Sequence, residues 1–544
     1  MIISKMKDGK TIYKSWRENG EKKFEMVDFR PYFFVSENHK EPSTYNASKY
    51  ILRDFDYVVG DWVNLERQPL KKVFVENSYD IKGAKGKFNK TYEADVPFHF
   101  RYCIDEIDKM PEYDMRKWYW DMEWQQGGEH HDKITVIVMY DNFDKEYKQW
   151  AWFPNYDGEN ELFFDNEKDM IESFMTTMIV KDPDMLIAWF GNFADIPKLL
   201  DRACSLGLNP LIMSPIGSIK GVKSSREGYT FAHAENGFGQ IEQPIGGRIT
   251  LNLDLAFERQ WNDSQRGTLP SMSLDYISEM VLNKKKLVSE KFPDTNVFYR
   301  RAWLEDTQTY LDYALKDVEL IVEIDETNFC SEAILSLQRL LKAPFDACFY
   351  ASHMGSIYFM RNAWWKCKTG KRVDKREEYE GAMIYDPLSE DTNGLHLNVA
   401  AFDFAGLYPS MMIARNISFE TKSDEPTELG VNILTPRDFS ETTRTKMLYY
   451  KTDELGLLPR AVIELKELRN EYKRLMREAR ESDNGEYAKW HNNQMAVKRL
   501  MASFYGIVAF QGFGWADVDL AASITASARE AIRLAAFKAK EMEG

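Results

Sequence analysis

Four carboxylates and a tyrosine, spread over separate segments of the chain, have the types and spacing that phosphodiester hydrolysis needs. Asp121 and Glu123 are two apart in Trp-Tyr-Trp-Asp-Met-Glu-Trp, so a strand would place both on one face. Asp195 follows an apolar run, and Tyr313 and Asp317 are four apart, one helical turn. Carboxylates that share a buried strand face repel unless a cation lies between them, so we expect divalent metal ions here. The alternative is an exposed edge strand whose acids face water.

This residue set suits a two-metal mechanism. One metal ion would activate water, the other would stabilise the leaving oxygen, and the tyrosine would orient the nucleophile. The four acids, Asp121, Glu123, Asp195 and Asp317, would be the metal ligands, and Mg²⁺ or Mn²⁺ is the expected cofactor.

Another acid, Asp403, ends an alternating run that begins at Leu395, and a sharp turn follows from Gly406 to Pro409. An acid at a strand end suits Mg²⁺, which takes one or two protein carboxylates and leaves its other positions for substrate phosphates. We therefore expect a strand over 395–403 with Asp403 as a metal ligand. The alternative is an ordinary strand-to-helix turn with a capping Asp.

A helical hairpin is expected beyond this turn. Its first helix carries five cations spaced 3, 4, 4 and 3 apart, which fall along one stripe: Lys466, Arg469, Lys473, Arg477 and Arg480. Ser482-Asp-Asn-Gly485 ends this helix, and a second runs from about Glu486 to Ser503 with Lys498 facing back. Cations beside a metal centre can bind a triphosphate. The alternative is a solvated hairpin whose own glutamates neutralise its basic residues.

Length and composition indicate a large protein of several domains. The chain has 544 residues, 44% of them hydrophobic, and a net charge of −15, which argues against simple coating of nucleic acid. Two basic clusters, 284–286 and 366–376, still offer local positive potential. The five cysteines are far apart and form no CxxC pair, which disfavours disulfides and zinc. No apolar run reaches the roughly 18 residues of a membrane span, so we expect a cytoplasmic protein, or one in the host-cell cytoplasm if it is viral.

Several motifs resemble one enzyme family. Asp403-Phe-Ala-Gly-Leu-Tyr-Pro-Ser410 resembles motif A of the family B DNA polymerases of archaea, eukaryotes and many viruses. Lys498 to Gly506 resembles motif B, and the segments with the four acids resemble the three motifs of that family's proofreading 3′–5′ exonuclease. Glu378 to Ala382 is similar to the linker that coordinates template passage between the two active sites. The resemblance implies a DNA-directed DNA polymerase with an exonuclease, acting on primer–template DNA and dNTPs.

The resemblance also implies individual roles. Tyr408 would exclude a ribose 2′-hydroxyl, Tyr505 would pack on the nascent base pair, and Arg469, Lys473 and Lys498 would bind the triphosphate. Asp121, Glu123, Asp195, Tyr313, Asp317 and Asp403 would be catalytic. Pro31 and Tyr32 resemble part of a pocket with which archaeal relatives detect deaminated bases.

Three positions depart from the family pattern. Phe190 and Ala194 stand where the middle exonuclease motif has Asn and Phe, so strand entry or metal geometry would be weakened. Ala502 replaces the Asn of motif B, which would make nucleotide incorporation slower or less discriminating.

The resemblance stops before motif C, which carries the second metal-binding carboxylate, and before the thumb. After Gly506 the only similar string is Asp517-Val-Asp519, which lacks the apolar strand of motif C. We therefore expect the large subunit of a split polymerase, completed by a second polypeptide that carries motif C and the thumb, with a sliding clamp as a further candidate partner. The alternative is a stand-alone metal-dependent 3′–5′ exonuclease or a DNA-binding remnant of a polymerase.

The expected fold class is α/β multidomain. It comprises a β-rich N-terminal domain, a ribonuclease H-like exonuclease domain and an incomplete polymerase palm with helical-hairpin fingers. The expected ranges are 1–110 for the N-terminal domain, 111–330 for the exonuclease, 331–394 for a helical part and linker, 395–445 for the palm, 446–505 for the fingers and 506–544 for a palm helix.

Overall fold

The computed structural model describes residues 1–544 except 41, 48–50, 154–162, 233–236, 264–266, 364–366, 369–377, 384–393, 396, 437–442, 484, 511–512 and 543–544. The chain forms two compact units. The first consists of 1–29 and 106–349, and the second of 30–105 and 350–544. All of the expected exonuclease residues lie in the first unit, and all of the expected polymerase residues lie in the second.

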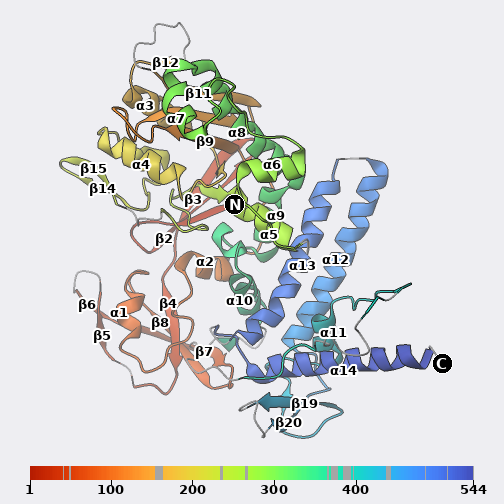
Figure 1. The fold of residues 1–544 in the computed structure, drawn as a ribbon. Coiled ribbons are helices and arrows are strands. Elements are labelled where there is room, and N and C mark those ends of the chain that lie inside the picture. The colour runs from red at the N-terminus through yellow and green to blue at the C-terminus, as the bar shows by residue number, and fades with distance from the viewer. Residues whose placement is uncertain are drawn as a thin grey trace. The chain divides into compact units, whose positions relative to one another are not determined.

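A six-stranded mixed sheet runs through the first unit (Figure 1). In spatial order it consists of β12 (Phe163–Phe164), β11 (Glu146–Trp152), β10 (Ile134–Asp141), β9 (Lys117–Trp124), β13 (Met185–Ala188) and β16 (Ile249–Asn252). Strand β10 is antiparallel to β9 and β11, whereas β13 is parallel to both β9 and β16. The apolar run before Asp195 is therefore a buried inner strand, as its composition predicts.

The two faces of β9 contact different helices. The rings of Trp118 and Trp120 lie 6.0 and 5.9 Å from that of Phe174 in α3 (Glu167–Lys181). On the other face, Tyr119 donates a hydrogen bond of 2.8 Å to Asp325 of α8 (Thr307–Asn328). Because side chains alternate along a strand, the expected metal ligands of β9 share the face of Tyr119 and point toward α8.

Two further helices of the first unit, α6 and α7, begin with a side-chain cap near the cleft described below. Ser273 accepts a hydrogen bond from the Tyr276 N–H at the start of α6, and Asp294 accepts one from the Val297 N–H at the start of α7. The other elements are α4 (Asp195–Ser205), α5 (Leu253–Asp263), α6 (Leu274–Leu282), α7 (Thr295–Glu305), α9 (Cys330–Leu341), η2 (Pro210–Met213), η3 (Phe345–Cys348) and the hairpin of β14 (Val222–Ser225) and β15 (Gly228–Phe231).

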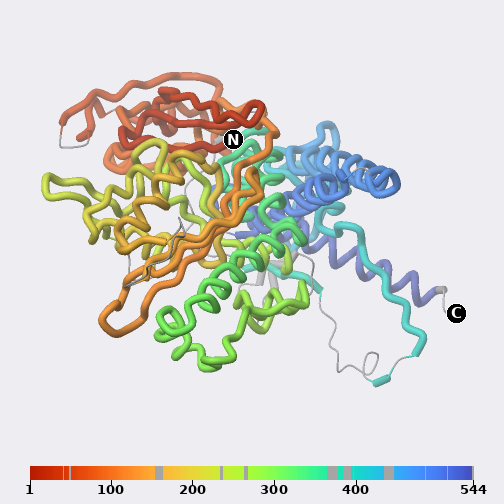
Figure 2. Tube along the Cα trace, turned by 90° about the horizontal axis from the view of Figure 1, so that it is seen from above, coloured from red at the N-terminus to blue at the C-terminus, as the bar shows by residue number. Residues whose placement is uncertain are grey.

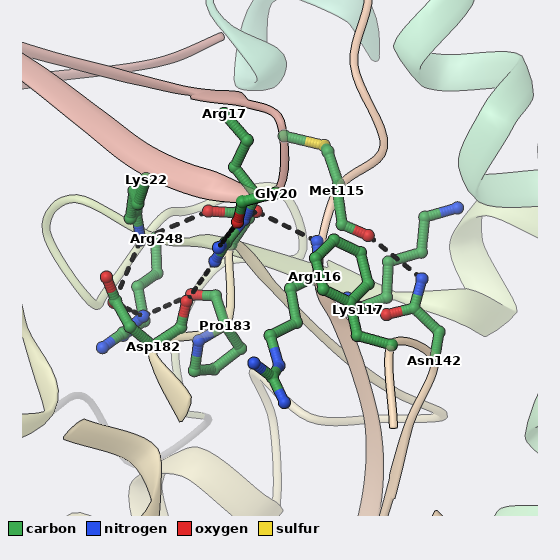
Figure 3. Close-up of polar contacts among 12 residues, drawn as sticks. Arg17, Gly20, Lys22, Met115, Arg116, Lys117, Asn142, Asp182, Pro183 and Arg248 are labelled. Carbon is green, nitrogen blue, oxygen red and sulfur yellow. Dashed lines mark hydrogen bonds and ion pairs between the residues drawn. The ribbon is translucent and has the colours of Figure 1, made fainter. Parts of the chain in front are cut away.

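Buried ion pairs attach the N-terminal strands to the first unit. Figure 3 shows Arg17 and Lys22 converging on the segment before β13. Arg17 donates to Asp184, and the Lys22 ammonium lies 3.0 Å from Asp182 and 3.3 Å from Asp184. Arg248 adds an ion pair of 2.6 Å with Asp182. This network explains why 1–29 belong to the same unit as 106–349. The strands concerned are β1 (Ile2–Lys5), β2 (Thr11–Glu18) and β3 (Glu21–Asp28).

Residues 30–105 contribute a small α/β layer to the second unit. Its sheet has the order β17 (Cys367–Lys368), β7 (Asp56–Asn64), β8 (Pro69–Phe74) and β4 (Tyr32–Ser36), with a separate hairpin of β5 (Thr44–Asn46) and β6 (Leu52–Asp54). Helices α1 (Ile81–Lys85) and α2 (Phe98–Glu106) complete it. Its apolar core includes Phe33, Val35, Phe55, Val73 and Phe88.

Two long helices dominate the rest of the second unit. Figures 1 and 2 show α12 (Leu457–Ser482) and α13 (Tyr487–Ala509) side by side, which confirms the expected hairpin. Asp483 ends α12 with a left-handed φ of 47°, at the predicted break. The other elements are α10 (Ala351–Asn362), α11 (Leu407–Ala414), α14 (Val518–Met542) and a sheet of β18 (Lys422–Ser423), β20 (Thr443–Tyr450) and β19 (Leu429–Pro436).

The strand expected over 395–403 is wrong. The described residues of this segment have no regular structure, and four of their apolar side chains are 72% to 96% exposed: Leu395, Leu397, Val399 and Phe402. A strand needs neighbours that accept its backbone hydrogen bonds and cover its apolar face, and none of the described strands pairs with this segment. The turn that follows is confirmed, because Gly406 has a φ of +72° and precedes α11.

The mixed α/β multidomain class is confirmed, whereas the finer domain ranges stay predictions. Among the residues that the structure describes, no helix is both long and apolar enough to cross a membrane.

Candidate active sites

Three of the expected metal ligands converge in the first unit. Asp121, Glu123 and Asp317 each place one carboxylate oxygen so that all three atoms lie within 4.8 Å of one another. They lie in a cleft of about 600 Å³, which we call the acidic cleft. Asp195, the first residue of α4, and Tyr313 also line this cleft, but Asp195 is not part of the three-carboxylate group. Alternation on β9 and a four-residue spacing on α8 thus bring together residues about 190 positions apart in the chain.

Burial makes the charged forms of these acids costly. Burial, followed by repulsion from Asp317, raises the pKa of Asp121 to about 7. Burial and then the nearby Asp121 carboxylate raise the pKa values of Glu123 and Asp195 well above their usual range. A cation among the carboxylates would remove this cost, which is the electrostatic signature expected of a metal site.

The donor set fits a divalent metal ion. Carboxylate oxygens are the ligands that Mg²⁺ and Mn²⁺ prefer, and Asp317 Oδ1 is buried without a hydrogen-bond partner among the described residues. A buried acceptor of this kind is costly unless something binds it. Asp121, Glu123 and Asp317 are therefore an acidic group that can hold a metal ion, with Asp195 beside them.

Lys286 and Tyr299 complete the acidic cleft, and sequence reasoning did not assign them. The Lys286 ammonium lies 2.5 Å from Asp317 and 3.2 Å from the Tyr313 hydroxyl. The Tyr299 hydroxyl lies 2.8 Å from that of Tyr313. The basic cluster 284–286 was the only signal for Lys286, and its other two lysines pair with Glu323 and Glu279. The second basic cluster, 366–376, lies almost entirely outside the described residues.

The two residues that depart from the middle exonuclease motif are part of the wall of the acidic cleft. Phe190 and Ala194 both line the acidic cleft, and Phe190 is 40% exposed. Between them, Asn192 is buried and donates hydrogen bonds to the carbonyls of Gly239, Gln240 and Glu242. Asn192 therefore fixes the neighbouring loop, whereas no amide reaches the cleft from position 190.

In the second unit, the expected nucleotide-binding tyrosines lie together. The rings of Tyr408 in α11 and Tyr505 in α13 have centroids 4.5 Å apart, and the Tyr505 hydroxyl lies 3.1 Å from that of Tyr379. Arg529 of α14 holds the same segment by donating to the carbonyls of Glu380 and Gly381. The segment that resembles the family linker thus contacts the tyrosine pair. Asp403 is exposed in the irregular segment before α11.

Two members of the cation stripe of α12, Arg469 and Lys473, lie beside α13, whereas Lys466, Arg477 and Arg480 are exposed. Arg469 donates to Gln494 of α13 at 3.3 Å. Burial lowers the pKa of Lys473, and the charges of Arg469, Arg477 and Lys498 lower it further. These cations therefore lie close enough to repel one another, and an anion between them would relieve that repulsion.

Asp517 and Asp519 are ion-paired. The Lys422 ammonium lies 2.5 Å from Asp517, and the Lys446 ammonium lies 2.9 Å from Asp519. Both acids thus already have cationic partners at the start of α14, and neither follows an apolar strand among the described residues before it.

The residues compared with a base-sensing pocket are buried in the second unit. Tyr32 is 6% exposed and its hydroxyl donates to Asp105 at 2.5 Å, while the Arg101 guanidinium lies 5.1 Å from its ring. Pro31 precedes it at the start of β4. A role in template sensing stays a prediction.

Comparison with known proteins connects both units to one family. DNA polymerase family B, exonuclease domain, matches 119–256, and DNA polymerase family B matches 354–542. A DNA polymerase of Pyrococcus glycovorans is 26% identical over 98% of this chain and 67% of its own length. The DNA polymerase delta catalytic subunit of Plasmodium falciparum is 26% identical over 69% of this chain and 34% of its own length.

The fold has a solved counterpart. The structure of the family B DNA polymerase from Pyrobaculum calidifontis matches with a TM-score of 0.72 and 18% identity, over 99% of this chain and 71% of the other. The chain spans about two thirds of the length of the archaeal relatives that it matches from end to end.

Proposed function

Because the chain belongs to family B of the DNA polymerases and carries that family's exonuclease domain, we propose that its acidic cleft is a metal-dependent 3′–5′ exonuclease site. The observation that carries this proposal is the convergence of Asp121, Glu123 and Asp317 within 4.8 Å in a cleft that Asp195 and Tyr313 also line. Separate elements supply these residues, and their mutual repulsion is costly unless a cation binds. DNA and its 3′-terminal nucleotide are the substrate.

The residues of the cleft have distinct tasks in this proposal. The four carboxylates would hold two Mg²⁺ or Mn²⁺ ions, which when bound would make water a better nucleophile and stabilise the leaving oxygen. Tyr313 orients the attacking water through its hydroxyl, and Lys286 keeps that hydroxyl and Asp317 in place. Apolar side chains such as Trp189 and Phe190 line the wall that the nucleobases would contact.

Hydrolysis of single-stranded DNA tests this proposal. With Mg²⁺ or Mn²⁺ the chain should remove nucleotides from the 3′ end of a labelled oligonucleotide. Asp121→Ala combined with Glu123→Ala should lower the rate by several orders of magnitude, because metal positioning is lost. The matched control is Asp312→Ala with Glu326→Ala, two exposed acids of α8, the helix that carries Asp317. Undiminished hydrolysis in the first double variant would remove these residues from the mechanism.

For the second unit we propose the nucleotide-binding part of a polymerase site. Tyr408 would exclude a ribose, Tyr505 would pack on the nascent pair, and the cations of the hairpin would bind the triphosphate of a dNTP. Convergence of Arg469, Lys473 and Lys498 supports this role, as does the 4.5 Å contact of the two tyrosine rings. Asp403 would be one of the two metal-binding carboxylates that phosphoryl transfer needs.

We further propose that the second carboxylate comes from a separate polypeptide, which makes this chain the large subunit of a split polymerase. Two observations support this arrangement. Asp517 and Asp519 already pair with lysines. The apolar segment that leads to Asp403 is exposed, as a strand lacking its neighbours would be. The sliding clamp expected from the resemblance stays a prediction.

A second candidate function is that of a stand-alone exonuclease. The contrast between the two sites favours it: the exonuclease acids converge in a cleft, whereas Asp403 is exposed in an irregular segment. The candidates differ in one result, because only the split polymerase gains primer extension when a polypeptide with the missing parts is added.

A further inference from the structure

A stretch of the second unit carries cations without any acid. Between Asp80 and Glu93 there are four basic residues and no acidic one, in a chain whose net charge is −15. These residues, Lys82, Lys85, Lys87 and Lys90, lie on α1 and on the turn that follows it. We refer to them as the lysine cluster.

Buried side chains anchor the backbone of this stretch. Ala84 and Phe88 are 0% and 7% exposed, and the Phe88 ring packs against Phe33, His39 and Phe55 with centroids 5.2 to 5.6 Å apart. Lys82, Lys87 and Lys90 are exposed, and Lys85 is half-buried. The aromatic anchor therefore fixes the backbone, whereas three of the four lysine side chains are exposed, with the Lys90 ammonium 5.0 Å from the centre of the Tyr92 ring.

The lysine cluster is not neutralised by its surroundings. The flanking acids Asp80 and Glu93 are 3% and 2% exposed, and Glu93 forms a buried ion pair of 2.5 Å with Arg101. Within the described part of the chain, no carboxylate lies at ion-pair distance from any of the four ammonium groups. The lysines of 284–286 differ from the lysine cluster, because each of them forms an ion pair with a carboxylate within 2.8 Å. The cluster thus keeps a local positive potential on an acidic protein.

We propose that the lysine cluster binds the sugar–phosphate backbone of single-stranded DNA. Phosphates match unpaired lysines in charge, and Gly83 and Gly86 leave the backbone between the lysines open to close approach, because a side chain at either would meet only one atom, no nearer than 3.4 Å. Tyr79, 52% exposed just before α1, offers a ring on which an unpaired base can stack. A duplex keeps its bases inside, so the aromatic ring favours a single strand. This surface lies outside the proposed exonuclease and nucleotide sites.

Salt dependence of binding tests the proposal. Binding of a fluorescent oligodeoxythymidylate is measured in EDTA, so that hydrolysis does not interfere. The variant Lys82→Gln/Lys85→Gln/Lys87→Gln/Lys90→Gln should bind more weakly, and its plot of log K against log salt should be flatter by about 0.7 for each lysine that contacts a phosphate, up to ~3 in total. If that variant is unfolded, Lys82→Gln/Lys87→Gln/Lys90→Gln is used in its place. Its plot of log K against log salt should have a slope that is flatter by up to ~2.

Matched controls separate a local surface from a general charge effect. Lys10→Gln/Lys145→Gln/Lys168→Gln/Lys540→Gln removes the same charge from scattered exposed positions and should keep the wild-type slope. Tyr79→Ala should weaken binding of the oligodeoxythymidylate but not of an abasic strand. A wild-type slope in the cluster variant, or equal flattening in the scattered variant, would overturn the proposal. If the cluster variant lost affinity for duplex DNA but not for the oligodeoxythymidylate, the assignment to a single strand would be overturned.

Discussion

The hydrogen bond between the Tyr299 and Tyr313 hydroxyls has a direction that a neighbouring lysine helps to fix. An ammonium group only donates, so the Tyr313 oxygen accepts from Lys286. If Tyr299 also donates to that oxygen, the hydrogen of Tyr313 is left for an acceptor in the acidic cleft, which is the Asp317 carboxylate one turn along α8 or a water or phosphate of the substrate complex. Tyr299 would then be a positioning residue that acts through Tyr313.

Tyr299→Phe should therefore lower kcat for single-stranded DNA about tenfold, the size of one hydrogen bond, and leave KM nearly unchanged. Steady-state hydrolysis measures both constants. In a Tyr313→Phe background the same substitution should have no further effect, since the group through which it acts is gone. Tyr310 lies on the same helix as Tyr313, and its buried hydroxyl is hydrogen-bonded to Thr135 of β10, so Tyr310→Phe should leave kcat unchanged. Additive losses in the double variant would contradict the positioning role.

The buried carboxyl of Asp254, at the start of α5, should make the free energy of unfolding depend on pH. Burial raises the pKa of this carboxyl to about 7, from an ordinary value of 3.8. A raised pKa means that the folded protein holds the proton more tightly than the unfolded chain. The free energy of unfolding therefore falls as pH rises from about 4 to about 7, by up to about 4 kcal/mol at ~1.4 kcal/mol per pKa unit.

Asp254→Asn should remove this loss, because the amide stays neutral. Thermal unfolding of the two proteins should differ little near pH 4, and the variant should be the more stable one above about pH 7. Parallel pH profiles would show that the ionised carboxyl is stabilised in the folded protein.

At the scale of elements, the sequence predicted best where one element decides the outcome. The alternation of β9 and the one-turn spacing of Tyr313 and Asp317 depend on local geometry alone, so the shared face of the acids followed from their positions. The stripe of α12 and its end near Ser482 are equally local.

What the sequence could not predict depends on contacts between elements. Lys286 reaches Asp317 from a loop 31 residues away, and nothing in its own cluster distinguishes it from Lys284 or Lys285. The expected strand before Asp403 failed because a strand needs partners, which the local pattern cannot reveal. Attachment of 1–29 to the first unit depends on ion pairs with residues more than 150 positions away.

The crossing of α10 and α13 allows an element-scale prediction. A Cβ atom added at Gly355 would lie 1.6 Å from Ile507 Cδ1, and Ile507 is fully buried. Gly355→Ala should therefore destabilise the second unit by about 1–3 kcal/mol in denaturant unfolding, despite the higher helix propensity of alanine. Adding Ile507→Val, which deletes the clashing methyl group, should recover part of that loss. At Gly506 an added Cβ atom would meet no described atom within 4 Å outside the backbone of its own helix, so Gly506→Ala should instead stabilise α13. Equal stabilities of the two alanine variants would contradict this packing.

At the scale of the whole molecule, the two units differ in how complete their proposed metal sites are. Four of the carboxylates that line the acidic cleft are expected metal ligands, whereas Asp403 is the one expected metal ligand among the described residues of the second unit. Phosphoryl transfer to a primer needs one metal ion to activate the 3′-hydroxyl and another to hold the triphosphate, and two carboxylates bridge them. The 544-residue polypeptide should therefore show nuclease activity without measurable nucleotide addition.

Primer extension should appear when a polypeptide carrying a second strand-end carboxylate and a duplex-holding thumb is mixed in. Extension of a labelled primer in a gel assay measures this, and Asp403→Ala in the large chain should abolish it while leaving exonuclease activity intact. If the 544 residues extend a primer alone, a second carboxylate must be present among them. Asp517 or Asp519 would then have to leave its lysine partner, and Asp517→Asn or Asp519→Asn would abolish extension. Extension that survives all three substitutions would exclude the carboxylate pair as the polymerase metal site.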